Sequence, residues 1–169
     1  MEGARFVDMN LLISSKKGDI DGVIAALSQG ASVTVRNQGH TPLLIAAQNG
    51  HTDFCGFLLA HESNLNEIMA DTKHTALHFA AVKGHNASIE ALLSWGAEVS
   101  PQDYLGFTQL HLACQEGHLL CVLTLLKAGA SLTLPDNHGL LPVHTAAQFN
   151  QVEIVRLLLE HGCSPDMVS

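Results

Sequence analysis

The sequence contains few positively charged and few aromatic residues. Lys and Arg together number 8 and Asp and Glu number 16, which gives a net charge of −8. A nucleic-acid partner is not expected, because neutralising phosphates requires clustered cations. The acidic balance predicts that the contact surface of a protein partner is neutral or basic. Aromatic residues make up 5% of the chain, so Ala, Leu and other small or aliphatic side chains must form the core.

Long apolar runs and a secretory leader are also missing. No run reaches the roughly 18 apolar residues of a membrane-spanning helix, so we expect no membrane insertion. The first ten residues, MEGARFVDMN, lack the basic start and apolar centre of a signal peptide. The four cysteines show no framework spacing, which predicts reduced, buried thiols. We therefore expect a cytoplasmic protein, with the nucleus as the alternative.

The sequence does contain an internal repeat of about 33 residues. The segments GHTPLLIAAQNGH, KHTALHFAAVKGH, GFTQLHLACQEGH and GLLPVHTAAQFNQ begin at positions 39, 73, 106 and 139. A fixed period of this length is typical of a solenoid, in which each unit packs only against its neighbours.

Each unit is predicted to form two short helices and an extended, turn-rich segment. In the first full unit, Thr41 can cap a helix that begins at Pro42, and the glycine that follows this helix can end it. The next segment, HTDFCGFLLAH, places Phe54, Phe57 and Leu58 at helical spacing. Stretches such as AEVSPQDYLG are rich in turn residues and predict a hairpin finger.

These units resemble ankyrin repeats, whose pattern is D-x-x-G-x-T-P-L-H-x-A-A-x-x-G-H followed by L-L-x-x-G-A. The third unit matches this pattern at Asp103, Gly106, Thr108, Leu110, His111, Ala113, Gly117, His118, Leu125, Leu126, Gly129 and Ala130. The fourth unit matches it at Asp136, Gly139, Pro142, His144, Ala146, Ala147, Leu158, Leu159 and Gly162. The resemblance implies an all-α ankyrin-repeat solenoid of stacked helix-turn-helix units with hairpin fingers.

The unit boundaries follow from the repeat. We expect a degenerate N-terminal capping repeat at 4-37 and ankyrin repeats at 38-70, 71-102, 103-135 and 136-169, the last of them continuing in a longer protein. The run from Ser14 to Lys17 replaces alanines of the internal units and predicts a solvated cap. Glu62, Lys73 and Asn150 stand where other units have glycine. The segment 62–73 is also one residue longer, so local irregularity is expected there.

The eleven histidines could suggest metal binding or acid–base catalysis. Most of them recur at fixed repeat positions: His78, His111 and His144; His51, His85 and His118; His40 and His74; His61 and His161. A catalytic group is needed once, so this recurrence favours a structural role. The resemblance implies that the first set ties neighbouring units together by hydrogen bonds. The spacing of His111, Cys114 and Cys121 leaves a zinc site as an alternative, although zinc needs about four converging ligands. We expect no catalytic residue, metal or cofactor.

The resemblance implies that partners bind a concave surface formed by the fingers and the exposed faces of the first helices. The partner-binding residues selected there are Tyr104, Leu105, Phe107, His74, Val82, Gln115, Glu116, His138, Leu140, Phe149 and, at its border, Trp95. The corresponding positions of the first full unit are Asn37, Gln38, His40, Gln48 and Asn49. Tyr104, Leu105 and Phe107 form the strongest candidate, because large apolar residues on an exposed finger mark interfaces. Packing of Leu105 and Phe107 against neighbouring fingers is the alternative.

The predicted function is a protein–protein interaction module, a scaffold or adaptor that is monomeric or part of a larger chain. One alternative is the recognition domain of a larger enzyme, such as a ubiquitin ligase or kinase, or of an ion channel. An enzyme in its own right and a synthetic consensus array are less favoured. The resemblance also makes Asn66 a candidate for β-hydroxylation by an asparaginyl hydroxylase, with a plain turn asparagine as the alternative.

Overall fold

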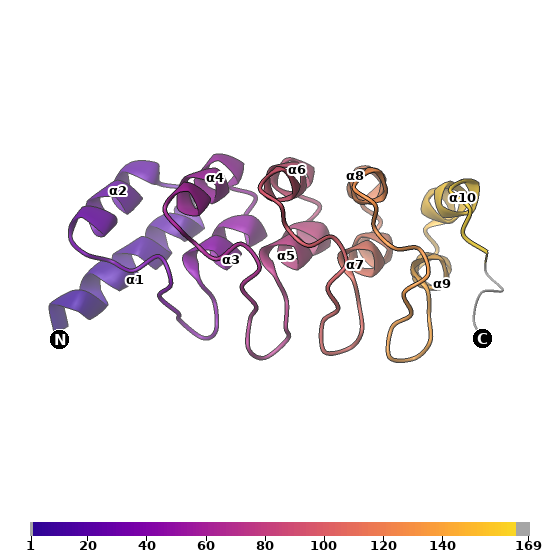
Figure 1. Ribbon diagram of the computed structural model, residues 1–169, viewed down its shortest axis with the longest axis horizontal. Helices are drawn as coiled ribbons and strands as arrows, with labels where there is room; N and C mark the ends of the chain where they lie inside the picture. Colours follow the sequence, from indigo (N-terminus) through magenta and orange to yellow (C-terminus); the bar gives the residue numbers. More distant parts are fainter. Residues whose placement is uncertain (1, 165–169) are drawn as a thin grey trace.

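The structure is a computed structural model that describes residues 2–164, with side chains from residue 6 onward. Within these residues, ten helices form one elongated array of helix pairs (Figure 1). They are α1 (Glu2–Lys17), α2 (Ile20–Ser28), α3 (Pro42–Gln48), α4 (Thr52–Ala60), α5 (Ala76–Lys83), α6 (Asn86–Ser94), α7 (Gln109–Glu116), α8 (Leu119–Lys127), α9 (Pro142–Gln148) and α10 (Val152–Glu160). Between residues 2 and 164 the structure contains an isolated bridge but no β-strand, and the predicted all-α solenoid is confirmed.

The helices form two rows (Figure 1). The inner helices α1, α3, α5, α7 and α9 pack against one another in sequence, and each contacts its own outer helix, α2, α4, α6, α8 or α10. Four fingers, residues 32–40, 65–74, 98–107 and 131–140, project from one side of the array (Figure 1). Because every finger and inner helix repeats in the same orientation, corresponding residues form rows along the array.

Local hydrogen bonds explain where the inner helices begin. Thr75 and Thr108 have extended backbones, and the hydroxyl of Thr108 accepts a hydrogen bond from the amide of His111 at 3.4 Å. In return, Nδ1 of His111 accepts a hydrogen bond from the amide of Thr108 at 3.2 Å. This reciprocal pair satisfies two backbone groups at the first turn of the helix, which otherwise lack partners within it.

Three residues that stand in place of glycine adopt the left-handed backbone conformation typical of glycine. Glu62 has φ 66°, Lys73 has φ 66° and Asn150 has φ 58°, all in the left-handed region. Residues other than Gly and Asn rarely adopt this conformation, so the backbone is strained at Glu62 and Lys73. The helix-turn-helix geometry of the repeat is therefore preserved, and the backbone strain is confined to these positions.

The irregularity expected in the second finger is confined to its tip. In the third finger, the amide of Asp103 donates to the carbonyl oxygen of Phe107 at 3.0 Å. In the second finger, the amide of Met69 donates to the carbonyl oxygen of His74 at 2.8 Å, which encloses one more residue. The longer turn absorbs the insertion, so the helices on both sides stay in step.

The core runs along the whole array between the two rows of helices. Outer helices contribute fully buried aliphatic and aromatic side chains at helical spacing, such as Phe54 and Leu58 on α4 and Ile89 and Leu92 on α6. Each pair covers the apolar side of its own inner helix and of the next pair. Isolated units could not bury these faces, which is why the array folds as one body.

The prediction of a solvated N-terminal cap is partly wrong. Lys16 and Lys17 are exposed, but Ser14 and Ser15 are buried. The hydroxyl of Ser15 donates to the carbonyl oxygen of Leu11 at 2.7 Å within the same helix. Serine is nearly as small as alanine and can satisfy its hydroxyl internally, so it fits the packed position that alanine occupies in other units.

Candidate partner-binding surface

In two units, a histidine of the first repeated set links the inner helix to the following finger. Nε2 of His78 donates to the carbonyl oxygen of Phe107 at 3.4 Å, and Nε2 of His111 donates to that of Leu140 at 3.0 Å. In both residues Nδ1 accepts a backbone amide, so the neutral ring is fully used. These contacts support the structural role that the recurrence indicated.

The second set links each outer helix to the preceding unit. The carbonyl oxygens of Lys16, Gln48 and Val82 accept hydrogen bonds of 3.0, 3.2 and 3.1 Å from Nε2 of the second-set histidines. These donors are His51, His85 and His118. In the last unit the amide of the Gln151 side chain takes over this role and donates to the carbonyl oxygen of Gln115 at 3.2 Å.

Burial disfavours the charged form of two first-set histidines, His78 and His111. The pKa of His78 is lowered from 6.5 to about 4, mainly by burial and in smaller part by the neighbouring ring of His74. Hydrogen bonding to Phe107 and the charge of Asp103 offset only part of this effect. Burial also lowers the pKa of His111. Both rings are therefore neutral at pH 7, as their hydrogen bonds require.

The cysteines are buried thiols. Burial raises the pKa of Cys55 to about 12 and that of Cys121 to about 11, and it also raises the pKa of Cys114 and Cys163. A thiol with a raised pKa is a poor nucleophile and a poor metal ligand at pH 7. Among the residues that the structure describes, no three His, Cys, Asp or Glu side chains are grouped to hold a metal ion.

The tip of the third finger presents two large apolar side chains to solvent. Tyr104 and Leu105 are each 58% exposed, whereas Phe107 is half-buried with its ring edge against His111. Leu105 is therefore exposed at the tip, whereas Phe107 is partly covered within its own unit. Asp103 holds the turn, since its Oδ1 accepts hydrogen bonds from the amides of Leu105 at 2.8 Å and Phe107 at 2.9 Å.

Neighbouring fingers fix the backbone of this tip. The amide of Tyr104 donates to the carbonyl oxygen of Thr72 in the second finger at 3.2 Å. On the other side, the side-chain amide of Asn137 donates to the carbonyl oxygen of Tyr104 at 2.8 Å, and its backbone amide donates to that of Leu105 at 3.0 Å. The exposed side chains thus stand on a backbone that is held from both sides.

The remaining predicted residues lie in different environments. His74 lies between two fingers, where its Nε2 is 3.1 Å from Oδ2 of Asp103 and its ring stacks on that of His78. Near the ends of α5 and α7, Val82 and Gln115 are half-buried and Glu116 is exposed.

In the last unit, His138 is exposed at the tip of the fourth finger and Leu140 is half-buried. Phe149 is 48% exposed after α9. Trp95 is 49% exposed but ends the outer helix α6, so it does not share an element with the fingers or inner helices.

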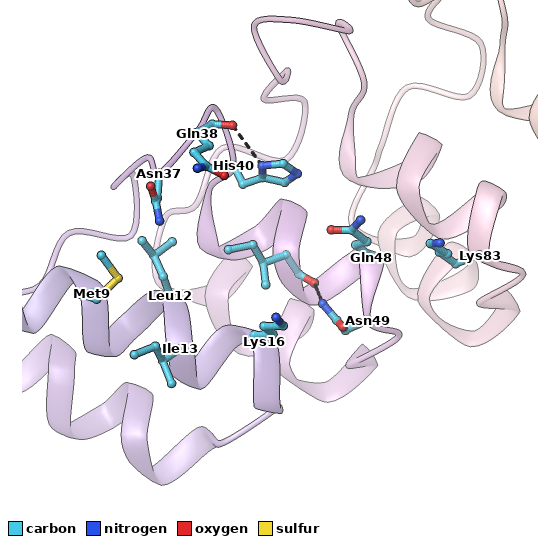
Figure 2. A pocket seen from close by; sticks show the side chains of 11 residues that line it. Met9, Leu12, Ile13, Lys16, Asn37, Gln38, His40, Gln48, Asn49 and Lys83 are labelled. Atoms are coloured by element: carbon cyan, nitrogen blue, oxygen red, sulfur yellow. Dashed lines mark hydrogen bonds between the residues drawn. The ribbon is translucent and has the colours of Figure 1, made fainter.

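A hollow lies near the other end of the array, at α1, the first finger and α3, and reaches α5 (Figure 2). Its volume is about 520 Å³, and we call it the N-terminal groove. Met9, Leu12 and Ile13 of α1 line it, with Gln38 of the first finger and Lys83 of α5 on other sides (Figure 2). A hollow of this size accommodates several side chains of a partner.

The sequence-based selection missed the apolar side of this groove. It identified the polar residues of the first unit, among them Gln38 and Gln48, but read α1 only as a degenerate cap. A signal was present, because Phe6, Met9 and Ile13 recur at i, i+3 and i+7 and lie on one helix face. All three are exposed, at 68%, 45% and 45%.

Comparisons with known proteins agree with this geometry. The sequence model described as ankyrin repeats (3 copies) matches residues 11–103 and 96–169. The chain is 40% identical over 96 residues to the E3 ubiquitin-protein ligase XBAT33 of Arabidopsis thaliana, a match that covers 56% of this chain and 18% of that protein. It is 36% identical over 85 residues to the probable E3 ubiquitin-protein ligase XBOS33 of Oryza sativa subsp. japonica, covering 50% of this chain and 16% of that protein.

A third relative is the BRCA1-associated RING domain protein 1 of Caenorhabditis elegans, which is 27% identical over 106 residues, 63% of this chain and 15% of that protein. The chain thus spans less than a fifth of the length of each of these three relatives. In the part of the chain that the structure describes, no helix has the length and apolar character needed to cross a bilayer. The family match covers well over half of the sequence, and the chain belongs to the ankyrin-repeat family.

Proposed function

We propose that this chain is a scaffold or adaptor that binds a partner protein through the surface formed by its fingers and inner helices. Ankyrin repeats are protein-interaction modules. The chain carries out no catalysis of its own in this proposal and requires no cofactor. We place its action in the cytoplasm, with the nucleus as the alternative, and we keep the division into one capping repeat and four full repeats.

The observation that carries this proposal is the tip of the third finger. Tyr104 and Leu105 expose more than half of their surface, although burying apolar surface away from water would lower the free energy. Their backbone is hydrogen-bonded to the second and fourth fingers, so a partner would not have to order a loose loop. Exposed aromatic and apolar side chains on a rigid scaffold are typical of interface hot spots.

Affinity capture from a cytosolic lysate tests this role. The wild-type chain is compared with a variant carrying Tyr104→Ala, Leu105→Ala and Phe107→Ala. We expect the wild type to retain a protein that the variant loses, while the helical circular dichroism of both chains stays the same. Equal capture by both chains would move the interface elsewhere, and capture of no specific protein would contradict a partner-binding role. A variant that loses its helical signal is replaced by the two exposed substitutions, Tyr104→Ala and Leu105→Ala.

A second candidate is the recognition domain of a larger enzyme. The names of two matched relatives favour it, because both are described as E3 ubiquitin-protein ligases and the chain spans only 16% and 18% of them. Kinases and ion channels remain in the same class of alternative. Sequencing the full-length transcript distinguishes these cases, since a ligase would require a catalytic domain in the same reading frame. A reading frame with no such domain would contradict this second candidate.

A further inference from the structure

The N-terminal groove differs from the rest of the molecule in charge. The chain carries a net charge of −8, yet the described residues that line the groove include Lys16 and Lys83 and no Asp or Glu. Neither lysine forms an ion pair with another described residue. Arg36, a cation of the neighbouring first finger, is paired with Glu67 and does not line the groove. The lining of the groove is therefore positively charged, in contrast to the acidic chain as a whole.

Corresponding residues along the inner helices show that this charge is confined to one half of the surface. The residue immediately before the glycine that ends each inner helix, or before Asn150 in the last unit, changes from unit to unit. In chain order these residues are Lys17, Asn49, Lys83, Glu116 and Phe149. Cations thus occupy this position in the first and third units, whereas the second residue is neutral, the fourth acidic and the fifth apolar.

Exposure of apolar surface follows the same direction. Five positions before the same glycine, or before Asn150, the residues in chain order are Ile13, Ile45, Phe79, Leu112 and Thr145. Ile13 is 45% exposed, Ile45 and Phe79 are half-buried, and Leu112 and Thr145 are only 7% and 2% exposed. At this position of the inner helices, apolar contact area is therefore available on the first units and is lost toward the last units.

The floor and rim of the groove suit a peptide chain. Met9, Ile13 and Ile45 supply apolar contact surface, and the side chains of Asn37 and Gln48 at the rim can pair with peptide amides and carbonyls. The backbone carbonyl oxygen of Gln38 accepts a hydrogen bond from Nδ1 of His40 at 3.1 Å (Figure 2). That bond fixes the His40 ring at the edge of the groove.

We propose that the N-terminal groove binds a short acidic peptide segment of a partner protein, with an apolar side chain between α1 and α3 and carboxylates at Lys16 and Lys83. This proposal rests on the protein-binding function proposed above and adds the chemistry of the partner. It reverses, at this site, the expectation from net charge that the partner is neutral or basic. The two lysines select the sign of the charge, and Met9 and Ile13 provide the contact area.

Selection from a displayed library of random 12-residue peptides on the full 169-residue chain tests the proposal. The site variant carries Lys16→Glu and Lys83→Glu. The matched control carries Lys17→Glu and Lys127→Glu, which change the net charge equally at exposed lysines outside the lining. A third variant, Ile13→Ser, removes apolar surface from a side chain that is already 45% exposed. Circular dichroism verifies that every variant is folded.

We expect peptides selected on the wild type to be rich in Asp and Glu around an apolar residue. Their affinity should fall about tenfold or more for the site variant, about threefold or more for Ile13→Ser, and less than about twofold for the control. Binding should also weaken as salt rises, because exposed ion pairs are screened. Carbodiimide should cross-link a carboxylate of the bound peptide to Lys16 or Lys83, as mapped by mass spectrometry.

The outcomes separate this proposal from the general function. Selection of no peptides, selection of basic peptides, or equal binding to wild type and site variant would overturn the groove proposal. Peptides that are lost instead from the Tyr104, Leu105 and Phe107 alanine variant would overturn it too, but would support the protein-binding function. The protein-binding function is tested separately by the lysate capture described above, where capture of no specific protein would contradict it.

Discussion

The imidazole ring of His118 lies directly against Gly84 of the preceding unit. A Cβ atom added to Gly84 would lie 2.7 Å from Nδ1 and Cε1 of that ring. The ring also donates, through Nε2, to the carbonyl oxygen of Val82 at 3.1 Å, so it cannot move away without breaking this bond. The glycine is thus required by its neighbour as well as by its own left-handed backbone, with φ 72°.

This contact predicts different costs for two glycine substitutions. Gly84→Ala places a methyl group against the His118 ring, whereas Gly96→Ala, at φ 91°, meets no atom within 4 Å. Both substitutions should lower the free energy of unfolding by about 1 kcal/mol, because alanine is disfavoured in the left-handed conformation. We expect Gly84→Ala to lower it by about 1–3 kcal/mol more, because the added methyl group overpacks the contact with the ring. Urea unfolding followed by circular dichroism measures both. Equal losses of stability would show that the ring contact contributes nothing.

A second prediction concerns pH. The folded-state pKa of His78, about 4, lies below the value of 6.5 expected when the ring is accessible. Below pH 6.5 the unfolded chain binds a proton that the folded chain excludes, so stability is lost as pH falls from 6.5 toward 4. For His78 alone we expect a loss of about 2 kcal/mol between pH 7 and pH 5. The lowered pKa of His111 acts in the same direction.

Urea unfolding at the two pH values tests this expectation in the wild type and in His78→Gln. The variant keeps a side-chain donor but cannot titrate, so the pH dependence should become shallower by the contribution of His78. His61→Gln serves as the control, because His61 is exposed and bonds only within its own helix end, to the carbonyl oxygen of Phe57. An unchanged slope in His78→Gln would assign the pH dependence to other groups.

A third prediction follows from the strained backbone at Glu62. This residue has φ 66° at a position where other units have glycine, including Gly96 and Gly129 with φ 91° and 86°. Glu62→Gly should stabilise the fold by about 0.5–1 kcal/mol, because relief of strain exceeds the added entropy of the unfolded chain. The reverse change, Gly96→Glu, should destabilise it by a similar amount. A loss of stability in Glu62→Gly would mean that a contact of the Glu62 side chain stabilises the fold by more than the backbone strain destabilises it.

The hydroxylation hypothesis for Asn66 gives a fourth prediction. Asn66 is exposed in the second finger, and its Oδ1 accepts a hydrogen bond from the amide of Glu98 at 3.2 Å. A hydroxyl group on Cβ leaves this amide oxygen free to keep its bond. Mass spectrometry of protein isolated from cells should find one added oxygen on Asn66 and none on Asn64, the nearby internal control. Absence of the added oxygen on Asn66 would favour a plain turn asparagine.

Much of the architecture could be predicted because its determinants are local and recur. Thr108 and His111 are three residues apart, and their reciprocal bonds form within one helical turn. The positions of glycine indicate where each helix ends, and Glu62 and Asn150 keep that geometry at positions which lost the glycine. The exposure of Tyr104 and Leu105 also follows from their place at a finger tip, where no later layer covers them.

The sequence by itself determined the period, the helix-turn-helix units and the recurrence that assigns the histidines to structure. Only the tertiary structure decided that Ser14 and Ser15 are buried, that His74 pairs with Asp103, and that a positively charged groove runs from α1 to α5. Capping bonds and helical spacing act within a few residues, so they can be read along the chain. A groove depends on side chains from three helices and a finger that meet only after the units have stacked.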